Sequence, residues 1–154
     1  MVKHIAGSTE LDILEIVKLR EDGKKIIFTN GVFDLLHDGH RYLLSEAKKF
    51  GDILVVGINS DLSVKRLKGS SRPVQFIADR VAALKCLPTV DFVLEFEEDT
   101  PLDLIKRIRP YIVVKGSDYN EQQVVGLDVV TEYGGRVELI ERVGGHSTTG
   151  IIEN

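Results

Sequence analysis

The sequence predicts an α/β fold: a single-domain, doubly wound (Rossmann-like) five-stranded parallel sheet with helices on both faces. Short apolar runs bounded by turn residues alternate with segments whose apolar residues recur at helical spacing, which is the pattern of successive strands and helices. The runs are continuous, as is typical of parallel strands buried on both faces. Polar or glycine-rich segments follow four of them, at 30–40, 59–61, 115–119 and 142–149. In such a sheet these tips are expected to converge on one edge, where ligands bind.

Length and composition indicate one globular domain over residues 1–154, with 1–23 as an N-terminal helical extension and 24–154 as the core. The net charge of −4 gives no global basic field for nucleic acid. The one cysteine, Cys86, excludes an internal disulfide, fits a reducing compartment and is expected to be a buried thiol. No apolar run is long enough to span a bilayer, and the N-terminus lacks the apolar core of a signal peptide. A cytoplasmic chain without a membrane or nucleic-acid partner is expected.

Capping and breaking residues mark the ends of the predicted elements. Ser8 is the expected N-cap of the first helix and Gly23 its stop, while Gly51 closes the second helix. Pro101 suits the first turn of a later helix that Pro110 ends. The predicted strands cover residues 26–28, 53–58, 91–96, 111–114 and 136–140. The predicted helices cover 8–22, 41–50, 75–87, 102–109 and 120–133, and a short terminal helix follows residue 149.

The strongest candidate for a functional site is the segment from 24 to 40, KKIIFTNGVFDLLHDGH. It places His37 and His40 at a strand-to-helix junction. A helix N-terminus offers unpaired N–H groups and a positive dipole end, both of which suit phosphate. Each imidazole can donate a hydrogen bond to a phosphoryl oxygen, and Gly39 would permit close approach of the backbone. Phosphoryl and nucleotidyl transfer need mainly positioning and charge stabilisation, so this pair suits such chemistry.

Other interpretations of the same segment stay open. The histidines are alternatively one surface and one packed side chain. A zinc site would need carboxylates or thiols to complete its shell, and the only cysteine lies in a predicted helix, so no metal site is expected. Asp34 either caps the turn or orients a ligand. The stretch Asn30, Gly31, Val32 and Phe33 is either a plain turn or brings backbone N–H groups to a nucleotide phosphate.

Residues 62–74 are predicted to form a polar loop that contains no acidic residue. Its cations are Lys65, Arg66, Lys68 and Arg72. The loop is either a lid that brings cations to phosphate or a solvated basic stretch. Arg80, early on the next helix, could bind phosphate from a rigid element or form a surface salt bridge.

A hydroxyl cluster lies near the C-terminus. Ser147, Thr148 and Thr149 follow two glycines and precede the predicted terminal helix, so they either hold β- and γ-phosphates or form a plain N-cap. The acidic run 95–99 is interpreted as a solvated loop rather than a metal site, although it could line a sugar pocket.

The segment GVFDLLHDGH resembles the His-x-Gly-His motif of the nucleotidyltransferase superfamily, which includes the cytidylyltransferases. Later segments agree in order: NSD at 59–61, KRLKG at 65–69, Arg80, KGSDY at 115–119 and GGHSTT at 144–149. Together with SSRPV and FEEDTPLDLI, they are most similar to the adenylyltransferases that make ADP-heptose for the lipopolysaccharide core. Such enzymes occur alone or as half of a bifunctional kinase/adenylyltransferase. The resemblance covers about residues 24–152 and implies the stand-alone form.

The resemblance implies that AMP is transferred from ATP to D-glycero-β-D-manno-heptose 1-phosphate, with Mg²⁺ carried by ATP and a homodimer as the assembly. It implies that His37 and His40 stabilise the α-phosphate during in-line attack. Lys68 would neutralise phosphate charge with Lys65 as a helper, and Arg80 would bind phosphate or the sugar phosphate. The remaining implied contacts are Val32 and Phe33 along the nucleotide, Gly116, Asp118 and Tyr119 at base and ribose, and Ser147, Thr148 and Thr149 at the β- and γ-phosphates.

One departure and two alternatives accompany this resemblance. Many superfamily members carry a basic residue shortly after the Ser/Thr cluster, where this chain has GIIEN. More weight therefore rests on the cations at 65–72. A cytidylyltransferase for glycerol 3-phosphate or a related alcohol phosphate shares the same motifs, which do not separate ATP from CTP. A non-catalytic nucleotide-binding module is the alternative of another class, and the intact histidines, Lys68 and Thr148 cluster argue against it.

Overall fold

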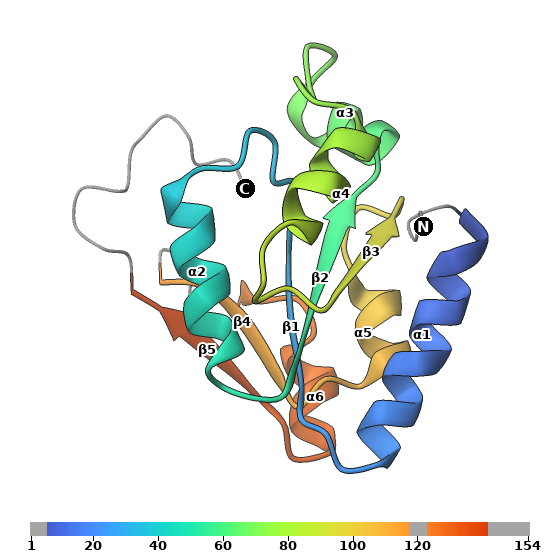
Figure 1. Ribbon diagram of the computed structural model, residues 1–154, viewed down its shortest axis with the longest axis vertical. Coiled ribbons are helices and arrows are strands. Elements are labelled where there is room, and N and C mark those ends of the chain that lie inside the picture. The colour runs from blue at the N-terminus through green and yellow to red at the C-terminus, as the bar shows by residue number, and fades with distance from the viewer. Residues whose placement is uncertain (1–5, 118–122, 142–154) are drawn as a thin grey trace.

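The computed structural model describes residues 6–117 and 123–141. The strands are β1 (Ile26–Gly31), β2 (Ile53–Asn59), β3 (Phe92–Phe96), β4 (Ile112–Gly116) and β5 (Arg136–Ile140). The helices are α1 (Ala6–Glu21), α2 (Asp38–Lys48), α3 (Asp61–Lys68), α4 (Ile77–Lys85), α5 (Leu102–Ile108) and α6 (Leu127–Glu132). Every strand pair is parallel and the order is β3-β2-β1-β4-β5, with helices on both faces (Figure 1). The predicted fold class is therefore confirmed.

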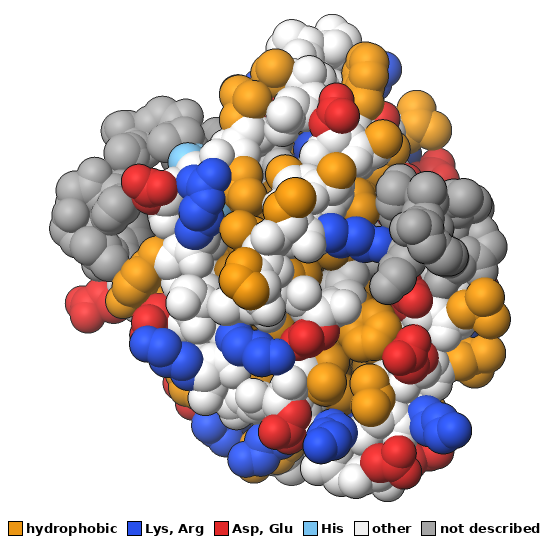
Figure 2. Space-filling model, in the orientation of Figure 1, with side chains coloured by type: hydrophobic (Ala, Val, Ile, Leu, Met, Phe, Trp, Pro, Cys, Tyr) orange, Lys and Arg blue, Asp and Glu red, His pale blue; other side chains and the backbone are white. Residues whose placement is uncertain are grey.

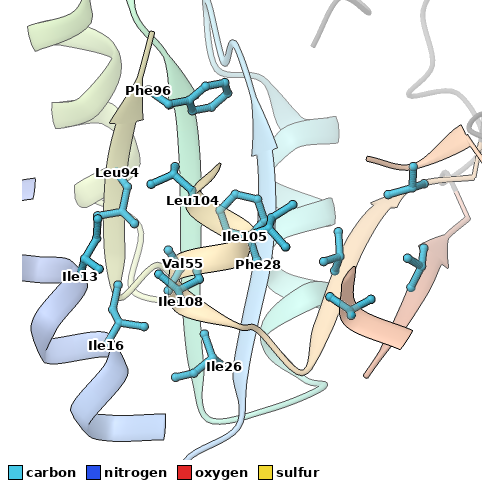
Figure 3. Close-up of a cluster of buried hydrophobic side chains, with 14 residues drawn as sticks. Ile13, Ile16, Ile26, Phe28, Val55, Leu94, Phe96, Leu104, Ile105 and Ile108 are labelled. Atoms are coloured by element: carbon cyan, nitrogen blue, oxygen red, sulfur yellow. The ribbon is translucent and has the colours of Figure 1, made fainter. Parts of the chain in front are cut away.

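Two apolar layers cover the two faces of the sheet. One layer joins α1, α5 and α6 to the sheet and includes Phe28 and Val113 of the central strands (Figure 3). The other joins α2 and α4 to the opposite face and includes Ile27 and Ile112. Because successive side chains of a strand point to opposite faces, a strand covered on both sides must be apolar at every position. This explains why the strands appear as continuous apolar runs in the sequence.

The carboxyl ends of the strands lie at one edge of the sheet (Figure 1). Strand order reverses between β1 and β4, because β2 and β3 extend the sheet on one side of β1 while β4 and β5 extend it on the other. Doubly wound sheets bind ligands in the crevice that forms at such a reversal. The predicted tips at 30–40 and 59–61 and the start of 115–119 share this edge, whereas 142–149 lies outside the described residues.

The predicted loop at 62–74 is wrong in its first half, which forms α3. The Ser60 hydroxyl accepts a hydrogen bond from the Ser63 N–H at 3.1 Å and so caps the helix. Val64 is fully buried and anchors it. These two contacts outweigh the polar composition of the segment. Exposed hydrophobic side chains gather over α3 and its connection to α4 (Figure 2): Leu62, Leu67, Val74 and Phe76.

Other boundaries differ in smaller ways. The helix predicted over 120–133 is shorter among its described residues, because Gly126 adopts φ +96° and α6 begins only at Leu127. The expected stop at Gly23 is confirmed by its φ of +95°. Cys86 is exposed rather than buried. The predicted terminal helix lies outside the described residues.

The helix predicted as an N-terminal extension packs into the core. Ile13 and Ile16 of α1 are buried in the layer shared with α5. Arg20 donates from Nη1 to the Ile108 carbonyl at 2.7 Å, and Arg107 holds both carboxylate oxygens of Glu10. This helix therefore helps to cover one face of the sheet and belongs to the core. Among the described residues, no helix has the length and apolar character needed to cross a membrane.

Candidate active site

The side chains of the two histidines cap α2 by accepting hydrogen bonds from backbone N–H groups of its first turn. His37 is the N-cap residue, and its Nδ1 accepts a hydrogen bond from the Gly39 N–H at 3.1 Å. His40 lies three residues on, and its Nδ1 accepts from the His37 N–H at 3.1 Å. This is the reciprocal pattern of a capping box, with imidazoles in place of hydroxyl and carboxylate. The two rings stack with centroids 3.7 Å apart, so the predicted pairing of the histidines is present in the fold.

The capping bonds determine which ring nitrogen carries the hydrogen. Each Nδ1 accepts a backbone hydrogen and therefore presents a lone pair, so in the neutral imidazole the hydrogen sits on Nε2. Both side chains are thus hydrogen-bond donors at Nε2. A histidine side chain reaches the surface near the N-terminal end of α2 (Figure 2). The ring of Phe33 packs edge to face against that of His40, with the two ring centroids 5.2 Å apart. The pair therefore places two oriented Nε2–H groups at a helix N-terminus, and the Nε2 atom of His37 is buried.

The loop from β1 to α2 has an unusual backbone that packing holds in place. Phe33 and Leu35 adopt φ values of +50° and +64°, which L-residues rarely do. Val32 and Phe33 are both buried, and Phe33 belongs to the apolar layer beneath α2 and α4. Gly31 is the last residue of β1. A strained loop that is fixed in this way places the following histidines without needing a ligand to order it.

Asp34 contacts a segment far along the chain. Its carboxylate, 4% exposed, accepts hydrogen bonds from the backbone N–H groups of Val74 at 2.7 Å and Gln75 at 2.9 Å. Gln75 returns the contact, because its Oε1 accepts from the Leu35 N–H at 3.2 Å. Asp34 therefore binds the backbone of the segment that leads into α4 rather than the backbone of its own turn. Its predicted role toward a ligand stays a prediction.

Arg80 is fully buried and its guanidinium joins three segments at the carboxyl edge. It donates to the carbonyl of Val32 at 3.0 Å and to that of Asn59 at 2.8 Å. It also bonds the Gln75 carbonyl at 2.9 Å and the Asp61 carboxylate at 2.6 Å. The expected surface salt bridge is therefore replaced by a buried network. The predicted contact of Arg80 with phosphate stays a prediction, and the structure shows it positioning the ends of β1 and β2.

Three of the four cations predicted to form a lid, Lys65, Arg66 and Lys68, lie on α3. Lys65 and Lys68 are exposed in the last turn of α3, where positive charge also complements the helix dipole. Arg66 is directed to the β3–α5 connection, where it bonds the Asp99 carboxylate at 3.2 Å and the Glu97 carbonyl. Arg72 lies 3.9 Å from Asp34. The basic segment is thus tied to ordered neighbours at both ends.

Glu95, in the acidic run 95–99, has a pKa that is shifted by its burial and by the charges of Asp61 and Arg80. Burial raises the pKa of its carboxyl, the nearby Asp61 charge raises it further, and the Arg80 charge opposes both. Glu95 therefore binds its proton more tightly in the folded protein than in the unfolded chain.

Glu95→Gln is expected to change how stability depends on pH. The stabilising contribution of this carboxyl is full below its ordinary pKa and is lost as pH rises through the raised value. The variant should therefore gain stability relative to the wild type between about pH 4 and about pH 7. Urea unfolding at both pH values measures this, and a difference in unfolding free energy that is the same at both would contradict it.

The end of β4 contributes a residue that the sequence did not single out. Gly116 is the last residue of β4, two residues beyond the predicted end of that strand, and its site role stays a prediction. Its neighbour Lys115 is buried, and the Lys115 Nζ lies 2.9 Å from the Asn30 carbonyl oxygen. A lysine at the end of an apolar strand, just before a polar tip, is the signal that would have found it. Asp118, Tyr119, Ser147, Thr148 and Thr149 lie outside the described residues.

The described residues line a cavity, and among them no cluster of metal-ligating side chains is present. A cavity of about 450 Å³ lies between α1, the end of β3 and α5, and it is lined by Ile13, Phe96 and Leu104 of the opposite apolar layer as well as by acidic side chains. It is therefore separate from the histidine pair. Within the described part of the chain, no group of three His, Cys, Asp or Glu side chains could hold a metal ion.

Comparisons with known proteins show which proteins this chain resembles. The Bifunctional protein HldE of Syntrophotalea carbinolica is 54% identical over 142 residues, which cover 92% of this chain and 29% of that protein. The Bifunctional protein HldE of Campylobacter curvus is 51% identical over 151 residues, which cover 98% of this chain and 31% of that protein. The chain thus spans less than a third of the length of these curated relatives.

A solved structure and a family model complete the comparison. The crystal structure of the lipopolysaccharide core biosynthesis protein from Thermoplasma volcanium GSS1 superposes with a TM-score of 0.64 and 29% identity, over 79% of this chain and 98% of that one. Residues 28–153, well over half of the sequence, match the model of the family described as cytidylyltransferase-like. The chain therefore belongs to the cytidylyltransferase-like family.

Proposed function

We propose that this chain transfers AMP from ATP to D-glycero-β-D-manno-heptose 1-phosphate, giving ADP-heptose and pyrophosphate for lipopolysaccharide core biosynthesis. The observation that carries the proposal is the pair of stacked imidazoles that caps α2 and presents two Nε2–H donors at the strand-order reversal. The sequence motifs support the acceptor. The likeness to the lipopolysaccharide core biosynthesis protein of Thermoplasma volcanium supports the pathway.

The proposed chemistry is an in-line displacement at phosphorus. An oxygen of the sugar 1-phosphate attacks the α-phosphorus of ATP. The bond from that phosphorus to the oxygen bridging to the β-phosphate breaks, and pyrophosphate leaves with its electrons. No bond forms between phosphorus and the protein. His37 and His40 donate to the α-phosphate oxygens, and the N-terminus of α2 adds positive potential as charge develops.

The remaining predicted contacts complete the proposed site. Lys68, helped by Lys65, would neutralise phosphate charge from α3, and Val32 and Phe33 would line the nucleotide. Gly116 with Asp118 and Tyr119 would border the base and ribose. Ser147, Thr148 and Thr149 would hold the β- and γ-phosphates.

Mg²⁺ is proposed to arrive bound to the phosphates of ATP. The described residues offer no cluster of three metal-ligating side chains, so this part of the chain does not fit a resident metal. The role assigned to the protein is therefore donation of hydrogen bonds from its own side chains.

The proposal extends to a cytoplasmic location, which the single cysteine supports, and to a homodimer, which rests on the family resemblance. Size-exclusion chromatography with light scattering would test the assembly, and a monomer across the working concentration range would reject it.

A cytidylyltransferase acting on glycerol 3-phosphate or a related alcohol phosphate is the second candidate, because the matching family model is described as cytidylyltransferase-like. The histidine pair serves both reactions equally, since both displace pyrophosphate from an α-phosphate. Base and acceptor choice separate the two candidates.

A pyrophosphate-release assay that crosses ATP and CTP with heptose 1-phosphate and glycerol 3-phosphate tests the proposal. Release is expected with ATP and heptose 1-phosphate. Release only with CTP and glycerol 3-phosphate would favour the second candidate. Nucleotide binding by calorimetry without release for any pair would favour a non-catalytic module. A His40→Asn preparation, purified in parallel, controls for contaminating transferases.

A further inference from the structure

The two central strands separate at their carboxyl ends. Register pairs join Ile27 to Ile112 and Phe28 to Val113, and the pairing of β1 with β4 stops there. β1 remains paired with β2 as far as Gly31, and β4 remains paired with β5 as far as Gly116. The opening therefore lies between β1 and β4 alone, which is where strand order reverses and where such sheets bind ligands.

Side chains bridge this opening where the backbone ladder ends. The buried Thr29 hydroxyl donates to the Val114 carbonyl at 2.7 Å. One step nearer the edge, the Nζ of Lys115 donates to the Asn30 carbonyl at 2.9 Å and lies 3.4 Å from Asn30 Oδ1. Lys115 is only 8% exposed. An amine buried this deeply needs acceptors, and Asn30 supplies two of them.

The lysine also orients the amide of Asn30. A lysine ammonium only donates hydrogen bonds, so it selects the amide oxygen and turns Nδ2 away. The side chain of Asn30 then offers N–H donors on the side remote from Lys115. Side chains alternate between faces along a strand, so Asn30 and Lys115 share the face of Phe28 and Val113, which α1, α5 and α6 cover. The histidine cap, through Phe33, belongs to the other face. Donors therefore approach the opening from both faces.

We infer that Lys115 is a positioning residue that holds the end of β1 and orients the Asn30 amide so that Nδ2 donates to a phosphate oxygen of a bound substrate. This inference rests on the proposed function, because it assumes a phosphate-bearing ligand at the opening. The phosphate belongs either to the nucleotide or to the acceptor, and both present the same anionic oxygens. Kinetic constants measured separately for ATP and for heptose 1-phosphate distinguish the two sources.

Variants of Asn30 test the donor directly. Asn30→Asp keeps two oxygen acceptors for Lys115 but removes the N–H donors and places negative charge against phosphate. We expect it to raise the KM of one substrate by tenfold or more, on the order of a lost charge-assisted hydrogen bond, with an unchanged melting temperature. Asn30→Ala should raise the same KM by roughly tenfold. An unchanged KM for both substrates in both variants would overturn the inference.

Variants of Lys115 test whether it acts through Asn30. Lys115→Met should raise the KM that Asn30→Ala raises, and the double variant should be no worse than the more severe single variant. Effects that multiply in the double variant would show independent action and overturn the positioning role. Lys115→Arg, which keeps a donor, should recover part of the loss. Lys18→Met, at an exposed lysine in the last turn of α1, is the matched control and should leave kcat and KM unchanged.

Calorimetry separates failure of this inference from failure of the proposed function. If the wild type releases no pyrophosphate from any substrate pair, the proposed function fails, and the same variants are compared by their Kd for ATP, CTP, heptose 1-phosphate and glycerol 3-phosphate. A weaker Kd in Asn30→Asp and Lys115→Met would still support the inference. Equal affinity for each of these ligands in all variants, or no binding of any of them by the wild type, would overturn it.

Discussion

His40→Ala is expected to lower kcat for pyrophosphate release by about 10²–10³-fold, as for loss of one donor to a developing oxyanion. The Nε2–H of His40 is proposed to strengthen its bond to the α-phosphate oxygens as the phosphorus is attacked. A contact that strengthens in the transition state affects kcat more than KM. Steady-state kinetics at saturating ATP and acceptor measures the effect, and a near-normal kcat would contradict the proposed role.

The alanine variant also disturbs the fold, because the same ring completes the helix cap. Its Nδ1 accepts the His37 N–H, and its ring packs against His37 and Phe33. Loss of a capping contact alone costs about 1 kcal/mol of unfolding free energy. A fall in the activity of His40→Ala could therefore come from the lost cap as well as from the lost donor. A second variant that keeps the cap separates the two causes.

His40→Asn is that matched variant. The Oδ1 of asparagine occupies a position similar to Nδ1 and can accept the His37 N–H, but no donor reaches the place of Nε2. We expect its melting temperature to stay closer to the wild type than that of His40→Ala, while its kcat falls to the same level. Full activity in His40→Asn would assign the histidine to capping rather than catalysis.

Arg80→Met is expected to lower the free energy of unfolding by about 3–5 kcal/mol, as for a buried ion pair that loses one partner. The change leaves the Asp61 carboxylate and three backbone carbonyls without their guanidinium donor. The carbonyls of Val32 and Asn59 then lose a partner in a buried environment, and the Asp61 carboxylate, whose side chain is 29% exposed, loses its ion pair. Urea denaturation followed by circular dichroism measures the loss.

Two further variants make the result specific to the buried network. Arg136→Met removes an exposed arginine that pairs with Glu138, and it should cost less than about 1 kcal/mol. Adding Asp61→Asn to Arg80→Met should cost less than the sum of the two single changes, because the carboxylate left unpaired by the first change is neutralised by the second. A loss in Arg80→Met no larger than that in Arg136→Met would show that the network contributes little to stability.

The sequence was informative where structure depends on residues close together in the chain. Continuous apolar runs predicted each strand found in residues 6–117 and 123–141, because a strand covered on both faces is apolar at each position. The histidine pair was found because a cap and the helix that it begins are a few residues apart. α3 was missed because its polar composition hid the Ser60 cap and the single buried anchor, Val64.

The partners of charged side chains were harder to predict, because they are distant in sequence. Asp34 binds backbone groups 40 and 41 residues away, and Arg80 reaches the Val32 carbonyl 48 residues away. Sequence alone left each of these residues between a local role and a ligand role. The fold supplies a third role for both, as links between the loops that surround the site.

The sequence by itself determined the parallel α/β fold, the strand-to-helix junction that carries His37 and His40, and the family motif around them. Only the tertiary structure decided the strand order, the buried network of Arg80 and the approach of Lys115 to Asn30 across 85 residues of sequence. The physical reason is one of range. Apolar periodicity and caps act within a few residues, whereas a buried charge is satisfied by whichever acceptors the packed strands bring to it.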